Sequence, residues 1–266
     1  MPTFVVGDIH GYPEILAQLL RDAGLVDRKL RWSGRDARLW LLGDLVDRGP
    51  DGIGAIDFVM RLERESEGDV RCLLGNHEAV THAVSRFERG NARGLGELLR
   101  SYWLNGGQEA DRARFRPEHA AWIERLPAVG RDGDWLLLHA DTDLYLRYGR
   151  SVEEINRTIS SVLATGDPDA VENLLDSLAD QTVLNDPAVV DSLLGALGGQ
   201  RIVHGHTPIT FVTGVDPELV TQPLAYGGGR VLNVDHCLFA GGPGFITELP
   251  VVSRDEVGTK SSDTAP

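Results

Sequence analysis

The sequence predicts an α/β fold in which short buried strands alternate with amphipathic helices. Five short runs rich in Val, Leu and Ile have the length of buried strands, and segments with helical spacing of apolar residues separate them. The runs cover residues 4–6, 39–42, 70–74, 135–138 and 201–203. A chain of 266 residues can bury one large core of this class or two small ones. We therefore expect a mostly layered architecture.

The predicted helices lie between and after the strand-like runs. Residues 13–25 carry Ile15, Leu16 and Leu20 on one face, and Pro13 lies near the first turn, where proline favours helix initiation. The same spacing predicts helices over residues 53–62, 95–104, 119–126, 152–163, 170–178 and 188–197.

The residue pattern changes after Thr207, from helical periodicity to short strand-like pieces. Pieces rich in β-branched residues, joined by Gly and Pro, predict strands over residues 208–212, 219–222, 230–234 and 245–249. Residues 251–266 are polar and are expected to form a disordered tail. We expect one domain over residues 1–250, in which the arginine-rich stretch 90–127 is a candidate cap or substrate-facing insert.

Composition excludes several classes of function. The net charge of −14 argues against a nucleic-acid surface, which needs a basic stripe to meet phosphates. No apolar run is long enough to span a bilayer, and we expect no membrane partner. Cys72 and Cys237 form no disulfide framework, and the N-terminal residues lack a signal-peptide pattern. A cytoplasmic location is therefore expected.

Each of the five apolar runs is followed by residues of the types that bind metals. In open α/β sheets, ligands gather outside the carboxyl ends of the strands. One such strand end is explained by polar capping, whereas five of them favour a metal site. Glycines before Asp8, Asp44 and Asn76 allow tight turns there. In chain order, the residues are Asp8 and His10, Asp44, Asn76 and His77, His139, and His204 with His206.

The donor set is chemically coherent. Two carboxylates, an amide oxygen and imidazoles form a mixed nitrogen and oxygen site without thiolate, which suits Mn²⁺, Fe or Zn better than a structural zinc. Six ligands are too many for one ion that keeps an open position. They suit two ions bridged by one carboxylate and one water.

Three blocks and two later segments resemble a known family. GDIHG (residues 7–11), GDLVDRG (43–49) and GNHE (75–78) resemble the signature blocks of the calcineurin-like metallophosphoesterases, and His139 and GHT (205–207) resemble the fourth and fifth. The Asp-Arg-Gly ending of the second block points to the phosphoprotein phosphatase branch. That branch includes serine/threonine phosphatases and bacterial diadenosine tetraphosphate hydrolases. The resemblance implies an α/β/β/α sandwich, with helices flanking a two-sheet core.

The resemblance also implies a metal centre. Asp8 and His10 would bind the first ion, and Asp44 would bridge both ions. The ligands of the second ion would be Asn76, His139 and His206. The ions would be two divalent cations, with Mn²⁺ expected first. A water between them, with its pKa lowered, would attack phosphorus directly and form no phosphoenzyme.

Three further residues carry implied catalytic roles. Arg48 would grip two phosphate oxygens, a bidentate contact that suits guanidinium, and Asn76 and His77 would also contact the substrate. His77 would protonate the leaving oxygen, and Asp47 would orient His77. Each of the three has a simpler interpretation. Arg48 would be an arginine in a turn, His77 a histidine at the start of a helix, and Asp47 a helix cap.

Several nearby residues receive weaker predictions. We expect His204 to be packed or to support a neighbouring ligand, and not to be a ligand itself. Asp235 is expected to be structural or to support a ligand, and His236 to make a local polar contact. Many family members add a second phosphate-binding arginine before the final block, and none is evident here. Arg147 and Arg150 are the named substitutes, since Arg201 lies inside the fifth strand run.

Three functions fit these residues. The leading hypothesis is a dinuclear metal-dependent phosphatase for phosphomonoesters, including phosphoserine and phosphothreonine in proteins. The alternative is a bis(5'-nucleosyl)-tetraphosphatase, for which the aromatic residues of the 90–127 stretch are candidate base-stacking groups or simple packing. A metal-binding regulatory module is the non-enzyme alternative, and the intact Asp47, Arg48 and His77 argue against it. The aromatic residues are Tyr102, Trp103, Phe115 and Trp122.

Overall fold

Two β-sheets pack face to face in the computed structural model, which describes residues 1–90, 95–165 and 167–250. The first sheet has the order β3 (Val70–Cys72), β2 (Arg38–Leu41), β1 (Thr3–Val6) and β9 (Thr247–Leu249), with β9 antiparallel to β1. The second has the order β4 (Val129–Asp132), β5 (Trp135–Leu138), β6 (Arg201–His204), β8 (Val231–Asn233) and β7 (Leu224–Tyr226). Strands β5, β6 and β8 are parallel, and β4 and β7 are antiparallel edges. Both sheets are therefore mixed.

Side chains alternate between the two faces of each sheet. In β2, Leu39 and Leu41 face the helices while Trp40 faces the other sheet, and Leu136 and Leu137 of β5 divide in the same way. Burial of each such leucine contributes about 1.5–3 kcal/mol. Because both faces are covered, these strands read as continuous apolar runs in the sequence. The inter-sheet cluster consists of Val5, Trp40, Leu42, Leu73, Trp135, Leu137, Val203, Ile209, Val220, Val234, Phe245 and Leu249.

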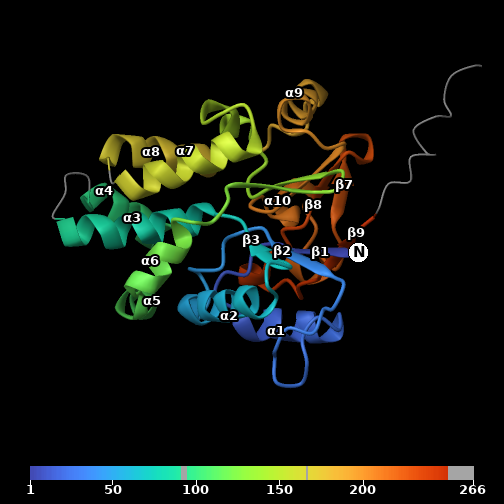
Figure 1. The fold of residues 1–266 in the computed structure, drawn as a ribbon, viewed down its shortest axis with the longest axis horizontal. Helices are drawn as coiled ribbons and strands as arrows, with labels where there is room; N and C mark the ends of the chain where they lie inside the picture. Colours follow the sequence, from blue (N-terminus) through green and yellow to red (C-terminus); the bar gives the residue numbers. More distant parts are fainter. Residues whose placement is uncertain (91–94, 166, 251–266) are drawn as a thin grey trace, which may run out of the picture.

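Helices cover both outer faces of the sandwich (Figure 1). Helices α1 (Pro13–Asp22) and α2 (Gly52–Glu65) lie against the first sheet, with α2 in contact with β3. Helices α7 (Val152–Thr165) and α9 (Pro187–Leu197) contact β4 and β6 of the second sheet. The α/β/β/α sandwich implied by the sequence motifs is confirmed.

A layer of helices extends from one side of the sheets (Figure 1). It is centred on α3 (Asn76–Gly90), which contacts α4 (Leu95–Leu104), α6 (Pro117–Ile123), α7 and α8 (Pro168–Leu178). The short helix α5 (Glu109–Arg114) follows α4. The 90–127 stretch therefore supplies three helices of this layer, and its residues 91–94 lie outside the described residues.

The segment after β6 corrects two sequence predictions. Residues 208–212 form the short helix α10 (Ile209–Thr213) and not a strand. Only Ile209 is fully buried there, and Gly214 ends the turn in the left-handed conformation. Residues 219–222 also form no strand, because a 3₁₀ turn, η2 (Pro217–Leu219), leads into β7. The other 3₁₀ turns are η1 (Leu144–Arg147), η3 (Gly227–Gly229) and η4 (Leu238–Ala240).

Two further predictions concern the ends of the molecule and its surroundings. The predicted strands near residues 230–234 and 245–249 are confirmed by β8 and β9. The expected tail, residues 251–266, lies outside the described residues. Within the described ranges, no helix combines the length and apolar character that a membrane span requires.

Candidate active site

The predicted metal ligands meet where the parallel strands of both sheets end. Asp8 and His10 follow β1, Asp44 follows β2, and Asn76 begins α3 after β3. From the second sheet, His139 comes directly after β5 and His206 shortly after β6. All of these side chains are buried except that of His206, which is partly buried.

Several site residues have left-handed backbone conformations. The φ angles are 46° at His10, 52° at Asp44, 66° at Asp47, 65° at Arg48 and 63° at His206. Residues other than glycine rarely adopt this backbone conformation. Such strained backbone conformations are more common at functional sites than elsewhere. Asp8 and His10 are two residues apart, but they do not converge through the alternation of side chains along a strand. The strand ends at Val6, and a turn brings the two side chains together.

The first donor group is formed around His10. Its Nδ1 donates to the carbonyl oxygen of Val46 at 2.9 Å, which leaves a lone pair on Nε2. This nitrogen lies 3.9 Å from Asp8 Oδ2 and 3.8 Å from Asp44 Oδ2. Three acceptor atoms thus face one point.

The second donor group has the same character. His139 Nδ1 donates to the carbonyl oxygen of Leu42 at 2.8 Å, and His206 Nε2 donates to that of Ala179 at 3.3 Å. The other ring nitrogens, His139 Nε2 and His206 Nδ1, lie 3.2 Å apart. His139 Nε2 lies 2.9 Å from Asn76 Oδ1, and His206 Nδ1 lies 3.0 Å from the same oxygen. Because all three atoms present lone pairs to one another, they repel unless a cation lies among them. Backbone carbonyls commonly orient metal-binding histidines in this way.

Asp44 belongs to both donor groups. Its Oδ2 faces His10, and its Oδ1 lies 3.4 Å from His139 Nε2. Gly75 makes room for this carboxylate, since a Cβ there would approach Asp44 Oδ1 to 2.2 Å. The residues present therefore fit two divalent cations that share one carboxylate.

Burial makes these carboxylates costly without a cation. Burial raises the pKa of Asp8 well above its ordinary value, and the nearby Asp235 and Asp44 raise it further. The pKa of Asp44 is raised in the same way, first by burial and then by Glu78. Bound divalent cations would supply the missing positive charge.

Glu78 organises the loop that carries the bridging carboxylate. Its buried carboxylate accepts backbone N–H groups from Asp44, Leu45, Val46 and Gly75, at 2.7–3.3 Å. Glu78 was not among the predicted site residues, although it is the last residue of GNHE. The sequence did contain one indication of this role: Glu78 is an acidic residue in the first turn of α3 and directly follows two candidate site residues.

The catalytic candidates lie beside the first donor group. His77 Nδ1 and Asp47 Oδ2 share a hydrogen bond of 2.7 Å, and Arg48 Nη2 donates to His77 Nε2 at 3.3 Å. Burial lowers the pKa of His77 and raises that of Asp47 to about 8. His77, His10 and Asp44 also form a three-donor group, so the geometry alone permits His77 as a ligand.

Comparison with known families decides where the chain belongs. The family model described as calcineurin-like phosphoesterase matches residues 1–210. The chain belongs to this family. Every predicted metal-binding and catalytic residue lies within the matched segment.

Curated relatives in this phosphoesterase family match part of the chain. It is 29% identical over 168 residues to the symmetrical bis(5'-nucleosyl)-tetraphosphatase of Vibrio parahaemolyticus, covering 58% of this chain and 52% of that protein. It is 31% identical over 140 residues to the protein of that name from Nitrosospira multiformis, covering 53% and 43%. The Shewanella-like protein phosphatase 2 of Arabidopsis thaliana is 33% identical over 96 residues, covering 35% and 24%. The chain spans about half the length of the tetraphosphatases.

Solved structures share the phosphoesterase fold over most of the chain. A cold-active protein-tyrosine phosphatase from a Shewanella species has a TM-score of 0.69 at 18% identity, covering 92% of this chain and 74% of that one. A serine/threonine phosphatase of Saccharomyces cerevisiae has a TM-score of 0.58 at 15% identity, covering 96% and 81%. At these identities the likeness concerns the fold alone.

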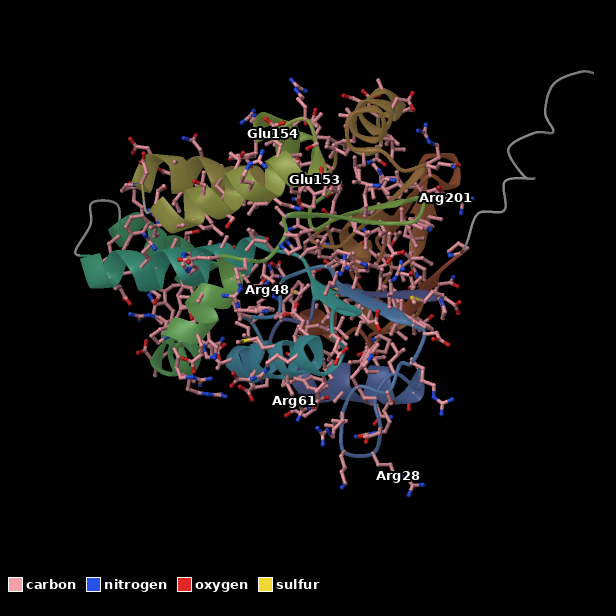
Figure 2. All side chains as sticks on the ribbon, in the orientation of Figure 1. Arg28, Arg48, Arg61, Glu153, Glu154 and Arg201 are labelled. Atoms are coloured by element: carbon pink, nitrogen blue, oxygen red, sulfur yellow. The ribbon has the colours of Figure 1, made fainter. Side chains whose placement is uncertain are left out.

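The arginines named as second phosphate contacts do not join the phosphoesterase site in this structure. Arg147 and Arg150 are exposed, and within the described residues neither guanidinium forms a hydrogen bond or ion pair with a candidate metal ligand. Arg201 begins β6, at the strand end opposite the site, and its guanidinium lies 5.7 Å from the ring centroid of Trp135. Figure 2 shows Arg201 well away from Arg48.

The two remaining histidines near the site differ from each other. His204 contacts the carbonyl oxygen of Gly205 at 2.8 Å and the hydroxyl of Tyr226 at 2.7 Å, so it is packed and lies outside both donor groups, as expected. The prediction that His236 makes a local polar contact is wrong. Its ring is fully buried, and neither ring nitrogen has a hydrogen-bond partner among the described residues. The ring packs edge-on against Phe245 instead.

The aromatic residues of the 90–127 stretch are mostly packing groups. Tyr102 and Trp122 are buried, and their polar atoms bond to Gln108 and Glu63 respectively. Phe115 is partly buried beside His119. Trp103 differs, because 43% of its surface is exposed.

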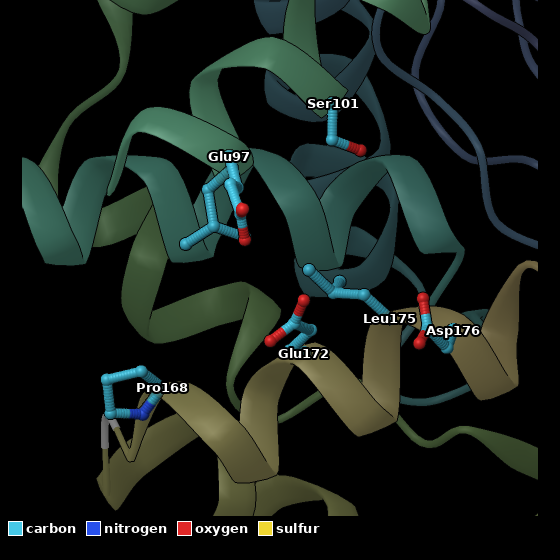
Figure 3. A pocket seen from close by; sticks show the side chains of 7 residues that line it. Glu97, Ser101, Pro168, Glu172, Leu175 and Asp176 are labelled. Atoms are coloured by element: carbon cyan, nitrogen blue, oxygen red, sulfur yellow. The ribbon is translucent and has the colours of Figure 1, made fainter. Parts of the chain in front are cut away.

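A cavity of about 120 Å³ lies between α4 and α8, apart from the residues of the metal centre (Figure 3). Glu97, Glu172 and Asp176 contribute carboxylates to its lining. Three carboxylates repel an anionic ligand. This cavity is therefore unsuited to the phosphate group of a phosphoester.

Proposed function

We propose that this chain is a two-metal phosphoesterase that hydrolyses dinucleoside polyphosphates. One observation carries the metal dependence: two groups of buried lone-pair donors converge on two points and share the carboxylate of Asp44. Cations would stabilise such groups in their charged form, whereas without cations burial favours protonation of the carboxylates. Two divalent cations held by these residues would supply a water of lowered pKa and would polarise the phosphoryl oxygens.

Arg48 is the proposed phosphate clamp. Its guanidinium is half-buried beside the first donor group and forms no ion pair with a carboxylate of the described residues within 4.0 Å. Its N–H groups are therefore available to two phosphate oxygens, and such bidentate bonds are the strong ones. Asn76 and His77 would complete the contacts to the phosphoryl group. The backbone N–H of His77 donates to Asp44 Oδ1 at 3.1 Å, and Asn76 Oδ1 lies 2.9 Å from His139 Nε2.

His77 and Asp47 are the proposed general acid and its positioning partner. Their hydrogen bond sets the orientation of the imidazole ring, whose Nε2 faces Arg48. Once Arg48 turns to a phosphate, a proton held by the pair can occupy Nε2, from which the leaving oxygen takes it. A cation bound to His77 Nε2 would compete with the guanidinium of Arg48 for the lone pair of that nitrogen. This competition favours the acid role of His77 over a ligand role.

The substrate class rests on the curated relatives. The tetraphosphatases match more of this chain than the Arabidopsis phosphatase does. This finding favours dinucleoside polyphosphates over the phosphomonoesters that the sequence analysis placed first. Among the described residues, Arg48 is the one arginine that contacts the proposed site residues, which agrees with this substrate class. A terminal phosphate dianion would have one guanidinium partner there, whereas a polyphosphate chain would offer further charged groups to the cations.

The 90–127 stretch is proposed to face the substrate. The carbonyl oxygen of Gly106 accepts a hydrogen bond from the N–H of Arg48 at 2.8 Å, and Gly106 itself donates to the carbonyl oxygen of Trp103 at 3.2 Å. Trp103, which is partly exposed, thus lies in the last turn of α4 and is hydrogen-bonded to the loop that contacts the clamp. It is the aromatic group in this stretch best suited to stack on a base.

A parallel substrate screen tests the proposal. Purified protein is assayed with diadenosine tetraphosphate, phosphoserine and phosphothreonine peptides, and para-nitrophenyl phosphate, each with Mn²⁺, Zn²⁺ or Ni²⁺ and after chelation. We expect metal-dependent cleavage of the dinucleotide into two molecules of ADP, at the highest kcat/KM of the set. A tenfold preference for phosphopeptides would restore the phosphomonoesterase hypothesis. Full activity after exhaustive metal removal would refute the two-metal hypothesis, and inactivity on every substrate would favour the regulatory module.

A further inference from the structure

Phe239 is an aromatic residue at the metal centre to which no role has been assigned. It lies on η4, after the end of β8, and its side chain is partly buried. The Cζ atom of Arg48 lies over its ring, 4.0 Å from the centroid. The same ring meets His10 edge-on, with 5.4 Å between centroids and 86° between planes. Phe239 therefore joins the proposed phosphate clamp to a metal ligand.

The way in which the guanidinium of Arg48 is held matters for its proposed role. A carboxylate partner would occupy the N–H groups that a phosphate needs, and none of the described carboxylates lies within ion-pair distance of Arg48. An aromatic ring instead attracts the cation through its face. The edge of the guanidinium, where the N–H groups are, stays available. One of these groups already points to His77 Nε2.

The loop between α4 and α5 holds the other end of the same side chain. Besides the hydrogen bond from the Arg48 N–H to the Gly106 carbonyl, the α-carbon of Gly106 packs against the side chain. A Cβ at Gly106 would approach Arg48 Cγ to 2.9 Å, and its φ of 89° also favours glycine. Two distant segments thus confine a flexible side chain at its root and at its charged end.

We propose that Phe239 is a positioning residue that sets the guanidinium of Arg48 before a phosphate arrives. This inference rests on the proposed function, in which Arg48 binds the phosphate. Preorganisation of a long side chain removes an entropy cost that binding would otherwise include. Loss of the ring face should therefore weaken both phosphate affinity and catalysis, and only through Arg48.

A double-mutant cycle tests this dependence. The variants are Phe239→Leu, Arg48→Ala and the double substitution, and each is measured by kcat/KM for para-nitrophenyl phosphate with Mn²⁺ and by calorimetric affinity for inorganic phosphate. We expect Phe239→Leu to lower both quantities about 3- to 10-fold in the presence of Arg48. In the Arg48→Ala background, the same substitution should change them less than about twofold. Phe239→Tyr, which keeps the ring face, should stay within about twofold of the wild type.

Matched controls separate positioning from packing. Phe211→Leu removes an exposed ring from α10 and should leave both quantities unchanged. Metal content and thermal unfolding are measured for every variant. If the Leu variant loses its metal, Phe239→Met, which keeps more bulk, replaces it in the cycle. Equal losses with and without Arg48, or no loss at all, would overturn the proposal.

Failure of the function and failure of the inference give different results. A wild-type protein that hydrolyses none of the phosphoesters tested contradicts the proposed function. The phosphate-affinity cycle then still decides whether Phe239 acts through Arg48. An active wild type with an additive cycle contradicts the inference alone.

Discussion

His236 provides a quantitative test of the packing around the site. Its ring is fully buried, packs edge-on against Phe245 at 5.3 Å, and lacks a hydrogen-bond partner among the described residues. Burial of this imidazole lowers its pKa to about 3. The ring is therefore neutral in the folded protein, whereas in the unfolded chain it gains a proton near pH 6.5.

The sign and size of the effect follow from this difference. Below pH 6.5 the unfolded chain binds a proton that the folded protein does not, so the free energy of unfolding falls as pH falls. The loss continues until the folded pKa is reached. At about 1.36 kcal/mol per pKa unit, this pKa shift lowers the free energy of unfolding by about 3 kcal/mol between pH 7 and pH 4. The loss is about 5 kcal/mol over the full range between the unfolded and folded pKa values.

The perturbation is His236→Leu, which removes the titratable ring and keeps an apolar side chain of similar size. Urea unfolding at pH 7 and pH 4, in chelator so that metal binding does not contribute, gives the free energy of unfolding at each pH. We expect the variant to gain about 3 kcal/mol relative to the wild type on going from pH 7 to pH 4.

The control for this prediction is Phe245→Leu, which trims the same contact without removing a titratable group. Its pH dependence should run parallel to that of the wild type, at lower stability. If His236→Leu and the wild type lose stability equally between the two pH values, the imidazole is not held neutral by burial. The reasoning from its unpartnered nitrogens would then be refuted.

Three further predictions concern the proposed active site. His77→Asn should lower kcat about 10²- to 10⁴-fold with metal content unchanged, as measured by mass spectrometry of bound metal; loss of metal would make His77 a ligand. Asp44→Asn should lower the content of both ions, whereas Asp8→Asn should mainly lower that of one, and equal losses would contradict the bridging position of Asp44. Glu78→Gln should lower the free energy of unfolding by about 1–3 kcal/mol for each backbone N–H group left without an acceptor, because an amide cannot accept all four N–H groups that the carboxylate binds. A change below about 1 kcal/mol in chemical denaturation would contradict this.

The strands predicted from the sequence share one physical property. Strands β2 and β5 are covered on both faces, so all of β5 and the three residues after Arg38 in β2 are apolar, and each run is evident. Strand β4 was not predicted, because it is an edge strand with the sequence VGRD and its last two residues are not fully buried. The strand predicted over residues 208–212 failed for the opposite reason. Its β-branched residues suit a strand, but the chain has already left the sheet at the site.

The candidate ligands were predictable because strand ends in this fold gather in one place, and the polar residues there stand out against apolar runs. Their geometry was not predictable in the same way. Asp8 and His10 converge through a left-handed turn, and five site residues adopt positive φ angles that residue identity alone does not announce. The partnerless burial of His236 was also missed. A histidine beside an aspartate in the sequence gives no sign that its ring turns into apolar surroundings.

The histidine tautomers show where sequence information ends at this site. The carbonyl groups of Val46, Leu42 and Ala179 each accept a hydrogen bond from one candidate metal-binding histidine, and so fix which nitrogen faces the donor groups. Any residue supplies a carbonyl oxygen, so no motif marks these positions. Ala179 lies at the end of α8, within the helical layer, and not on a strand. The helical layer therefore helps to set the metal-binding geometry, and substitutions that shift α8 should alter metal affinity even though no side chain of that helix is among the predicted ligands.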